Sequence, residues 1–118
     1  MSFFENKEIK ERKKELSLEP NDPAAHFNLG AAYDKAGKLP DAIKEFEATI
    51  KIHPNSAEAH FNLGVLYESV NQGEKAIVHI LKAGNLFGDK NDAVNKMESR
   101  RLLKEFYRKF GFKAEDIE

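Results

Sequence analysis

Residues 25–33 read A-H-F-N-L-G-A-A-Y, and 34 residues later the chain reads A-H-F-N-L-G-V-L-Y over residues 59–67. Ala42 and Ile43 return as Ala76 and Ile77 at the same offset. A fixed period of this length, with small and aromatic residues at the recurring positions, is typical of a stack of helical repeats. The sequence therefore predicts an all-α chain that contains two copies of one structural unit.

The spacing within the recurring stretch predicts a helix. His26, Leu29, Gly30 and Tyr33 follow each other at i, i+3, i+4 and i+7, so they share one helix face. A glycine inside a helix costs about 1 kcal/mol relative to alanine. Its return as Gly64 indicates a packing role, because a residue without Cβ lets a neighbouring helix approach closely.

The recurring residues resemble the tetratricopeptide repeat (TPR), a helix–turn–helix unit. In the first copy the residues that match the TPR motif are Leu29, Gly30, Tyr33, Ala42, Phe46 and the closing Pro54. The second copy keeps Leu63, Gly64, Tyr67, Ala76 and Ala83, but Ile80 replaces the aromatic residue and Gly88 replaces the proline. These departures favour a second unit that lies at one end of the stack.

The resemblance implies a TPR-type α-solenoid of antiparallel helix hairpins with capping helices at both ends. The expected divisions are an N-terminal charged capping helix in residues 1–22, repeat 1 in 23–56, repeat 2 in 57–90, and a C-terminal capping helix with a short tail in 91–118. The N-terminal segment looks like the second helix of a degenerate preceding repeat. Residues 16–21 match residues 50–55 at the same offset, while Glu8, Arg12 and Glu15 stand where small residues are expected.

Capping residues predict where the helices begin and end. Asp22 and Pro23 suit the start of a first-repeat helix over residues 23–36, Pro40 begins its partner over 40–53, and Ser56 can cap a helix that ends near residue 70. The next helix is expected to end at Phe87, and a short link over residues 88–90 leads to a last helix over 91–110. Residues 113–118 look like a loose acidic tail.

The second helix of repeat 2 is apolar almost all round, since residues 76–87 read A-I-V-H-I-L-K-A-G-N-L-F. A helix with more than one apolar stripe is covered on more than one side. The last helix is the natural cover, and Val94 and Met97 are expected to pack where repeat residues pack. A second copy of the protein is the alternative cover.

Composition excludes several classes of protein. The chain of 118 residues is long enough for one core; its 19 lysines and arginines nearly balance 20 acidic residues, and it has no cysteine. Phe3 and Phe4 are followed at once by charged residues, so the start does not read as a signal peptide. No apolar run approaches the roughly 18 residues that span a bilayer. We expect a soluble, cytoplasmic protein.

Four histidines raise the question of a metal site. His26 and His60 lie on equivalent faces of successive helices, about 9–10 Å apart by ordinary helix packing. His53 and His79 stand singly, and no cysteine or acidic cluster completes a ligand set. No nucleophile–base arrangement or phosphate-binding glycine loop has a diagnostic spacing. The sequence predicts no metal, no cofactor and no enzyme activity.

What remains is a binding surface. In a stack of helix hairpins the first helices line the concave side, which binds extended partners. The candidate groove residues are Phe27, Asn28, Ala31 and Lys35 in repeat 1, and Phe61, Asn62, Val65 and Glu68 in repeat 2. An asparagine amide both donates and accepts, which suits it to hold a peptide backbone. In TPR proteins asparagines at this position often do so. The alternative is that the phenylalanines pack between repeats while the asparagines face water.

The predicted function is a non-enzymatic adaptor that binds a peptide or an extended segment of a partner protein. One TPR specialisation is a clamp that binds the C-termini of chaperones. Asn62 fits its pattern, but Phe27 and Ala31 stand where the resemblance implies a lysine and an asparagine, so this binding is disfavoured.

Two other functions remain open. One is a homodimer formed through the second helix of repeat 2 and the last helix. The other is contact of a basic last helix with an anionic membrane or nucleic acid, which is a less favoured hypothesis. The basic residues concerned are Arg100, Arg101, Lys104, Arg108, Lys109 and Lys113.

Overall fold

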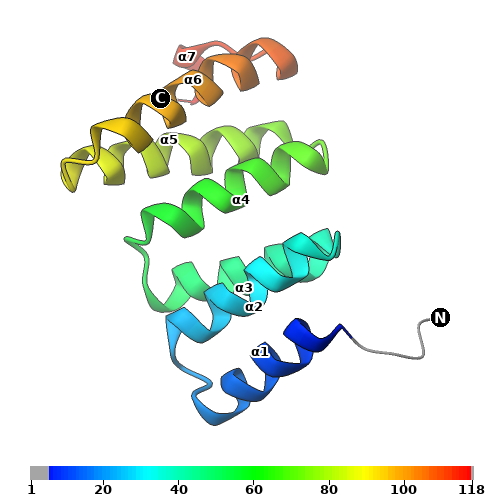
Figure 1. Ribbon diagram of the computed structural model, residues 1–118. Coiled ribbons are helices and arrows are strands. Elements are labelled where there is room, and N and C mark those ends of the chain that lie inside the picture. Colours follow the sequence, from blue (N-terminus) through cyan, green and yellow to red (C-terminus); the bar gives the residue numbers. More distant parts are fainter. Residues whose placement is uncertain (1–5, 118) are drawn as a thin grey trace. The chain divides into compact units, whose positions relative to one another are not determined.

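The computed structural model describes residues 6–117, with Ile117 described only by its backbone. The described residues form helices and no strand (Figure 1). The helices are α1 Lys7–Leu18, α2 Pro23–Lys35, α3 Leu39–Ile52, α4 Ala57–Ser69, α5 Gly73–Asp89, α6 Ala93–Phe110 and α7 Ala114–Ile117. The all-α prediction is therefore confirmed. The predicted start of the charged N-terminal segment, residues 1–5 with Phe3 and Phe4, lies outside the described residues, as does Glu118.

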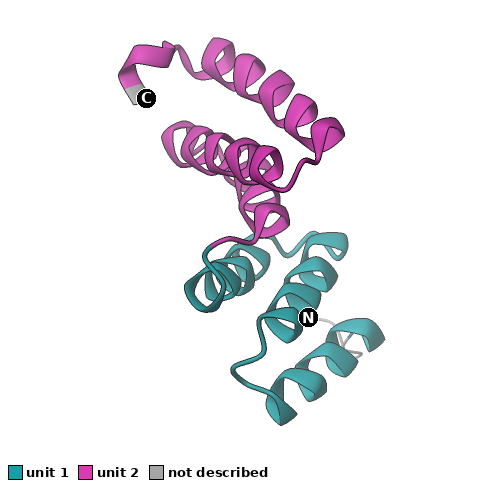
Figure 2. Cartoon of the chain, turned by 90° about the vertical axis from the view of Figure 1, so that its left-hand side faces the viewer, with its two compact units in different colours: residues 1–54 teal, residues 55–118 magenta. Residues whose placement is uncertain are grey.

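The chain divides into two compact units, residues 1–54 and residues 55–118 (Figure 2). The first unit holds α1, α2 and α3, and α2 contacts both of the others. The second unit holds α4, α5, α6 and α7, and α5 contacts the other three.

Side-chain caps set the starts of α2, α4 and α6, as Asn6 does for α1. The Asp22 carboxylate accepts a hydrogen bond from the Ala24 backbone N–H at 2.9 Å, and Ser56 Oγ accepts one from the Ala59 N–H at 3.2 Å. The Asp92 carboxylate does the same for the Asn95 N–H at 3.1 Å. Each bond satisfies a backbone donor that has no partner within its helix. The observed starts of α2 and α4 match the sequence predictions, and α6 begins two residues later than expected.

In the first unit, α2 and α3 meet at the glycine that the repeat predicts. A Cβ placed on Gly30 would lie 3.1 Å from Cε1 of Phe46, whose side chain is fully buried. On the other side of α2, Ile9 of α1 packs into a cluster with Leu29 and Ala32. The predicted close approach of the helices at Gly30 is confirmed.

In the second unit, α4 and α5 repeat this contact with less space. A Cβ on Gly64 would lie 2.6 Å from Cδ1 of Ile80 and 3.2 Å from the Ala76 carbonyl oxygen. Ile80 and Ala76 are fully buried. Isoleucine at the position of Phe46 therefore fills the equivalent gap with a β-branched side chain, and Gly64 leaves no room for a methyl group.

The second apolar stripe of α5 is covered by α6 of the same chain (Figure 1). Three glycines of α5 face this helix: Gly73 lies against the Phe110 side chain, Gly84 against Ser99, and Gly88 against Lys96. Repeat 1 has no glycine at the corresponding positions, which are 39, 50 and 54. These glycines thus let α6 pack closely on α5.

The face of α6 that packs is not the one that the sequence predicted. Val94 and Met97 are 77% and 71% exposed, whereas Ser99 and Phe106 are buried. The expectation that Val94 and Met97 pack like repeat residues is therefore wrong. At the position of Val94, His26 and His60 bond to the helix that follows each of them, whereas α6 and α7 are not among the helix pairs in extensive contact in the described structure.

Two other boundaries differ from the predictions. Helix α5 continues to Asp89, so Gly88 lies inside the helix and not in a link. Residues 114–117 form the short helix α7, which contacts α5, where a loose tail was expected. Packing against neighbouring helices extends structure into segments whose local sequence resembles a turn or a tail.

Candidate functional site

The eight predicted groove residues fall on two helices, four on α2 in the first unit and four on α4 in the second. Within each helix they lie on adjacent turns, so each set forms one face. We name these the α2 face (Phe27, Asn28, Ala31, Lys35) and the α4 face (Phe61, Asn62, Val65, Glu68).

On the α2 face, the Phe27 ring packs edge-on against Phe46 of α3, with centroids 5.2 Å apart. Asn28 is exposed, and the described structure records no hydrogen bond for its amide. Lys35, at the end of the helix, pairs with Glu8 of α1 at 3.3 Å. This face therefore presents a half-buried aromatic ring beside an amide, with an intramolecular ion pair at one end.

The α4 face has the same construction. The Phe61 ring packs edge-on against Phe87 of α5, with centroids 6.3 Å apart. Asn62 is half-buried, again with no hydrogen bond recorded within the described chain, and Val65 is 36% exposed. Glu68 pairs with Lys109 of α6. Both phenylalanines are thus held by their own hairpins, and both asparagines keep hydrogen-bonding capacity at the surface.

The sequence did not predict the pairing of two histidines. His60 of α4 and His79 of α5 approach with their Nδ1 atoms 3.0 Å apart, and His79 also stacks on Tyr67 with centroids 5.5 Å apart. The interpretation of His79 as a single residue is therefore wrong. In repeat 1 the equivalent positions hold His26 and Glu45, which bond at 2.9 Å. The offset of 34 residues takes His26 to His60 and Glu45 to His79, so the sequence repeat could have predicted that the two histidines meet.

The paired histidines do not by themselves make a metal centre. Within residues 6–117 no three His, Cys, Asp or Glu side chains lie close enough together to hold a metal ion. Two imidazoles fall short of the four ligands of a structural zinc site and the three protein ligands of a catalytic one. The pair reads as a contact that joins α4 to α5.

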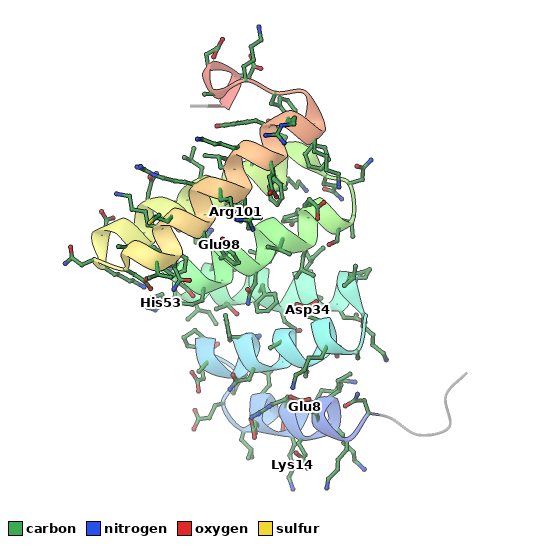
Figure 3. The ribbon with its side chains drawn as sticks, turned by 45° about the horizontal axis from the view of Figure 1, so that its top comes forward. Glu8, Lys14, Asp34, His53, Glu98 and Arg101 are labelled. Carbon is green, nitrogen blue, oxygen red and sulfur yellow. The ribbon has the colours of Figure 1, made fainter. Side chains whose placement is uncertain are left out.

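Part of the positive charge of α6 is compensated within the chain. Arg101 donates to Glu98 and Glu105, each at 2.6 Å, and Figure 3 labels Arg101 and Glu98 as neighbours on this helix. The hydrogen bonds from Arg101 lower the pKa of the Glu98 carboxyl. Lys109 is paired with Glu68. Arg100, Lys104 and Arg108 are exposed and have no recorded acidic partner among the described residues.

No helix in residues 6–117 combines the length and the apolar content that a membrane span requires.

Comparison with known proteins identifies the repeat. A family model described as "TPR repeat" matches residues 33–71, and one described as "Tetratricopeptide repeat" matches residues 13–44. A search of curated protein sequences gave no significant match.

Solved structures share the fold. The Yersinia enterocolitica type III secretion translocator chaperone SycD superposes with a TM-score of 0.81 at 16% identity, covering 86% of this chain and 70% of SycD. MamA superposes with a TM-score of 0.62 at 22% identity, covering 86% of this chain and 67% of MamA. A double mutant titled MamA RS-1 gives 0.60 at 26% identity, covering 86% and 65% of the two chains. At these identities the likeness is one of fold.

Proposed function

Because the chain contains tetratricopeptide repeats, we propose that it is a non-enzymatic adaptor, and that the α2 face and the α4 face each bind an extended segment of a partner protein. Helical repeat proteins characteristically bind partners on the surface lined by such helices.

The observation that carries the proposal is the repeated asparagine. Asn28 and Asn62 occupy the same position of the two repeats, and the described structure records no hydrogen bond for either side chain. Neither amide is among the buried groups that lack a partner, so water can bond to both until a ligand displaces it. An extended peptide has free backbone N–H and C=O groups on its edge, and each amide can bond to one of each.

The neighbouring aromatic rings support the same function. Phe27 and Phe61 are half-buried and held at fixed positions by Phe46 and Phe87. A ring that is already ordered loses little conformational freedom when a partner covers its exposed part. Lys35 and Glu68, at the ends of the two faces, are already paired with Glu8 and Lys109. We therefore expect each face to bind its partner through the asparagine amide and the phenylalanine ring, and not through ion pairs.

The uncovered apolar stripe of α5 was the reason to consider a homodimer. The second apolar stripe of α5 is covered by α6 of the same chain and so gives no reason to expect a second copy, although Val78 of α5 and Val94 and Met97 of α6 stay exposed. Binding of a different protein is the function we favour.

The test is selection of peptides from a phage-displayed library of random dodecapeptides, followed by fluorescence anisotropy on the enriched sequences. We expect dissociation constants on the order of micromolar, because the contact area is small. Asn28→Ala combined with Asn62→Ala should weaken binding about tenfold, for loss of roughly two net hydrogen bonds. The loss should be similar for peptides with unrelated side chains, because the amides hold the backbone.

A matched control is available at the same repeat offset. Asn21 and Asn55 are exposed asparagines in the turns before α2 and α4. Asn21→Ala with Asn55→Ala should leave affinity unchanged. Enriched peptides that bind the Asn28/Asn62 variant as tightly as the wild type would contradict the proposal, as would a library that yields no peptide binding above background.

A further inference from the structure

The second unit contains a hollow that lies away from the α4 face. It lies between α5 and α6 beside the first residue of α7, and its volume is about 420 Å³. This is within the usual range for sites that bind small ligands or side chains. Ile80 and Leu81 of α5 and Leu103 and Tyr107 of α6 supply apolar lining. The size and lining fit one or two apolar side chains.

A row of positive charge borders the hollow. Arg100 and Lys104 are among its lining residues, and Arg108 continues the row one turn further along α6. The three are exposed and follow each other at i, i+4 and i+8, so they share one helix face. Like charges at this spacing destabilise a helix, and no carboxylate is among the residues that line the hollow in the described structure.

The chain's own helix α7 lies at the edge of the hollow. It is a short acidic segment, Ala114–Ile117, that packs on α5 with Ala114 at the edge of the hollow. The Asp116 carboxylate accepts a hydrogen bond from the Lys113 backbone N–H at 2.8 Å, so it caps α7. Ala114, the first residue of this acidic segment, therefore lies at the hollow that the basic row borders.

We propose that this hollow is a second docking site, which takes a peptide segment of a partner protein with one or two large apolar residues flanked by acidic residues. The apolar side chains enter between α5 and α6, and the carboxylates pair with Arg100, Lys104 and Arg108. Charge complementarity selects the acidic flanks, and the shape of the hollow selects the apolar centre.

Other anionic partners fit these observations less well. A membrane surface needs several apolar side chains that point outward beside the cations; Met97 is exposed three residues before Arg100, but Leu103 and Tyr107 are half-buried and line the hollow. Nucleic acid offers no apolar side chain to fill it. The net charge of −1 gives the chain no long-range attraction to a polyanion.

The experiment uses a fluorescein-labelled octapeptide, Asp-Asp-Asp-Leu-Phe-Asp-Asp-Asp, and fluorescence anisotropy in low salt. We expect a dissociation constant on the order of 10–100 µM. Replacing Leu-Phe by Gly-Ser, or all aspartates by lysines, should abolish measurable binding. Raising the ionic strength to about 0.3 M should weaken binding several-fold, because exposed charges are then screened.

The protein variant that tests the basic row is Arg100→Gln with Lys104→Gln, which should weaken binding about tenfold. Glutamine keeps the helix propensity of both positions. Lys10→Gln with Lys14→Gln on α1 is the matched control, since it removes two exposed charges at the same i, i+4 spacing. That control should bind the octapeptide as the wild type does.

Hydrogen exchange of the protein–octapeptide complex shows whether the peptide binds at the hollow or on the α4 face. Slower exchange in α5 and α6 with no change in the N-terminal half of α4 is the expected result. Equal binding of the Gly-Ser peptide, or no effect of the Arg100/Lys104 variant, would overturn the proposal. So would protection confined to α4, or tighter binding to phosphatidylserine vesicles or to a single-stranded oligonucleotide than to the octapeptide.

Discussion

Replacing Gly64 by alanine places a methyl group where α4 and α5 already touch. Its Cβ would lie 2.6 Å from Cδ1 of Ile80, and the Cγ1 atom of the same side chain is nearer still. Ordinary carbon–carbon contacts are about 3.5–4.0 Å, so the two helices must separate by about 1 Å or Ile80 must leave its rotamer. Ile80 is fully buried, so a new rotamer must displace packed neighbours or turn towards the hollow between α5 and α6.

Two opposing terms set the magnitude. Overpacking of a core costs about 1–3 kcal/mol, and alanine gains about 1 kcal/mol over glycine inside a helix. The Gly64 contacts with Ile80 are shorter than 3.0 Å, which puts the overpacking cost at about 2–3 kcal/mol, so we expect a net loss of about 1–2 kcal/mol for Gly64→Ala and a larger one for Gly64→Leu. Gly30→Ala is the matched comparison, because its Cβ would lie 3.1 Å from the Phe46 ring, which needs to move only slightly. There the two terms nearly cancel, and stability should change by less than about 0.5 kcal/mol.

The assay is urea unfolding followed by circular dichroism at 222 nm, with hydrogen exchange to locate the effect. Gly64→Ala should lower the unfolding midpoint and speed exchange in α4 and α5, while Gly30→Ala should leave the midpoint nearly unchanged. If Gly64→Ala proved as stable as Gly30→Ala, the helices would not be in close contact at Gly64 and the packing argument would be refuted.

Three further predictions concern α6. The hydrogen bonds from the Asn95 side chain and backbone lower the pKa of the Asp92 carboxyl from 3.8, so its stabilising effect is present above that value and is lost as pH falls through the lower folded-state value. The difference in melting temperature between wild type and Asp92→Ala should therefore be full at pH 7 and should shrink as the pH falls below 3.8, whereas Asp92→Asn should lose less because asparagine also caps helices. Gly73→Ala should loosen α6, because its Cβ would lie 2.8 Å from Cβ of Phe110; faster exchange in α6 checks this, and unchanged exchange would contradict it. Met97→Gln should change the free energy of unfolding by less than about 0.5 kcal/mol, since the side chain is 71% exposed; a larger loss in urea unfolding would mean that this face is covered.

Much of the candidate site was open to prediction because it repeats. The same offset that relates Gly30 to Gly64 also relates Asn28 to Asn62, and in the structure Asn28 is exposed on α2 and Asn62 is half-buried on α4. The ion pairs that Lys35 and Glu68 make with α1 and α6 could not be predicted, because a long flexible side chain has many possible partners within reach.

The sequence by itself determined the all-α class, the helix starts at Asp22 and Ser56, and the glycine contacts of Gly30 and Gly64. These features depend on spacing along one helix or on bonds between residues a few positions apart, and such interactions are visible in a short window. Because the sequence repeats, a feature predicted for one copy was also predicted for the other.

The tertiary structure alone decided which face of α6 is buried and that His60 meets His79. Helix α6 carries apolar residues on two faces, with Met97 on one and Phe106 on the other, and its own pattern favours neither. The choice depends on the neighbour: α5 offers a row of glycines on one side, and the described chain offers no helix on the other. Burial is a property of the pair of surfaces that meet, so a pattern read along one helix cannot fix it.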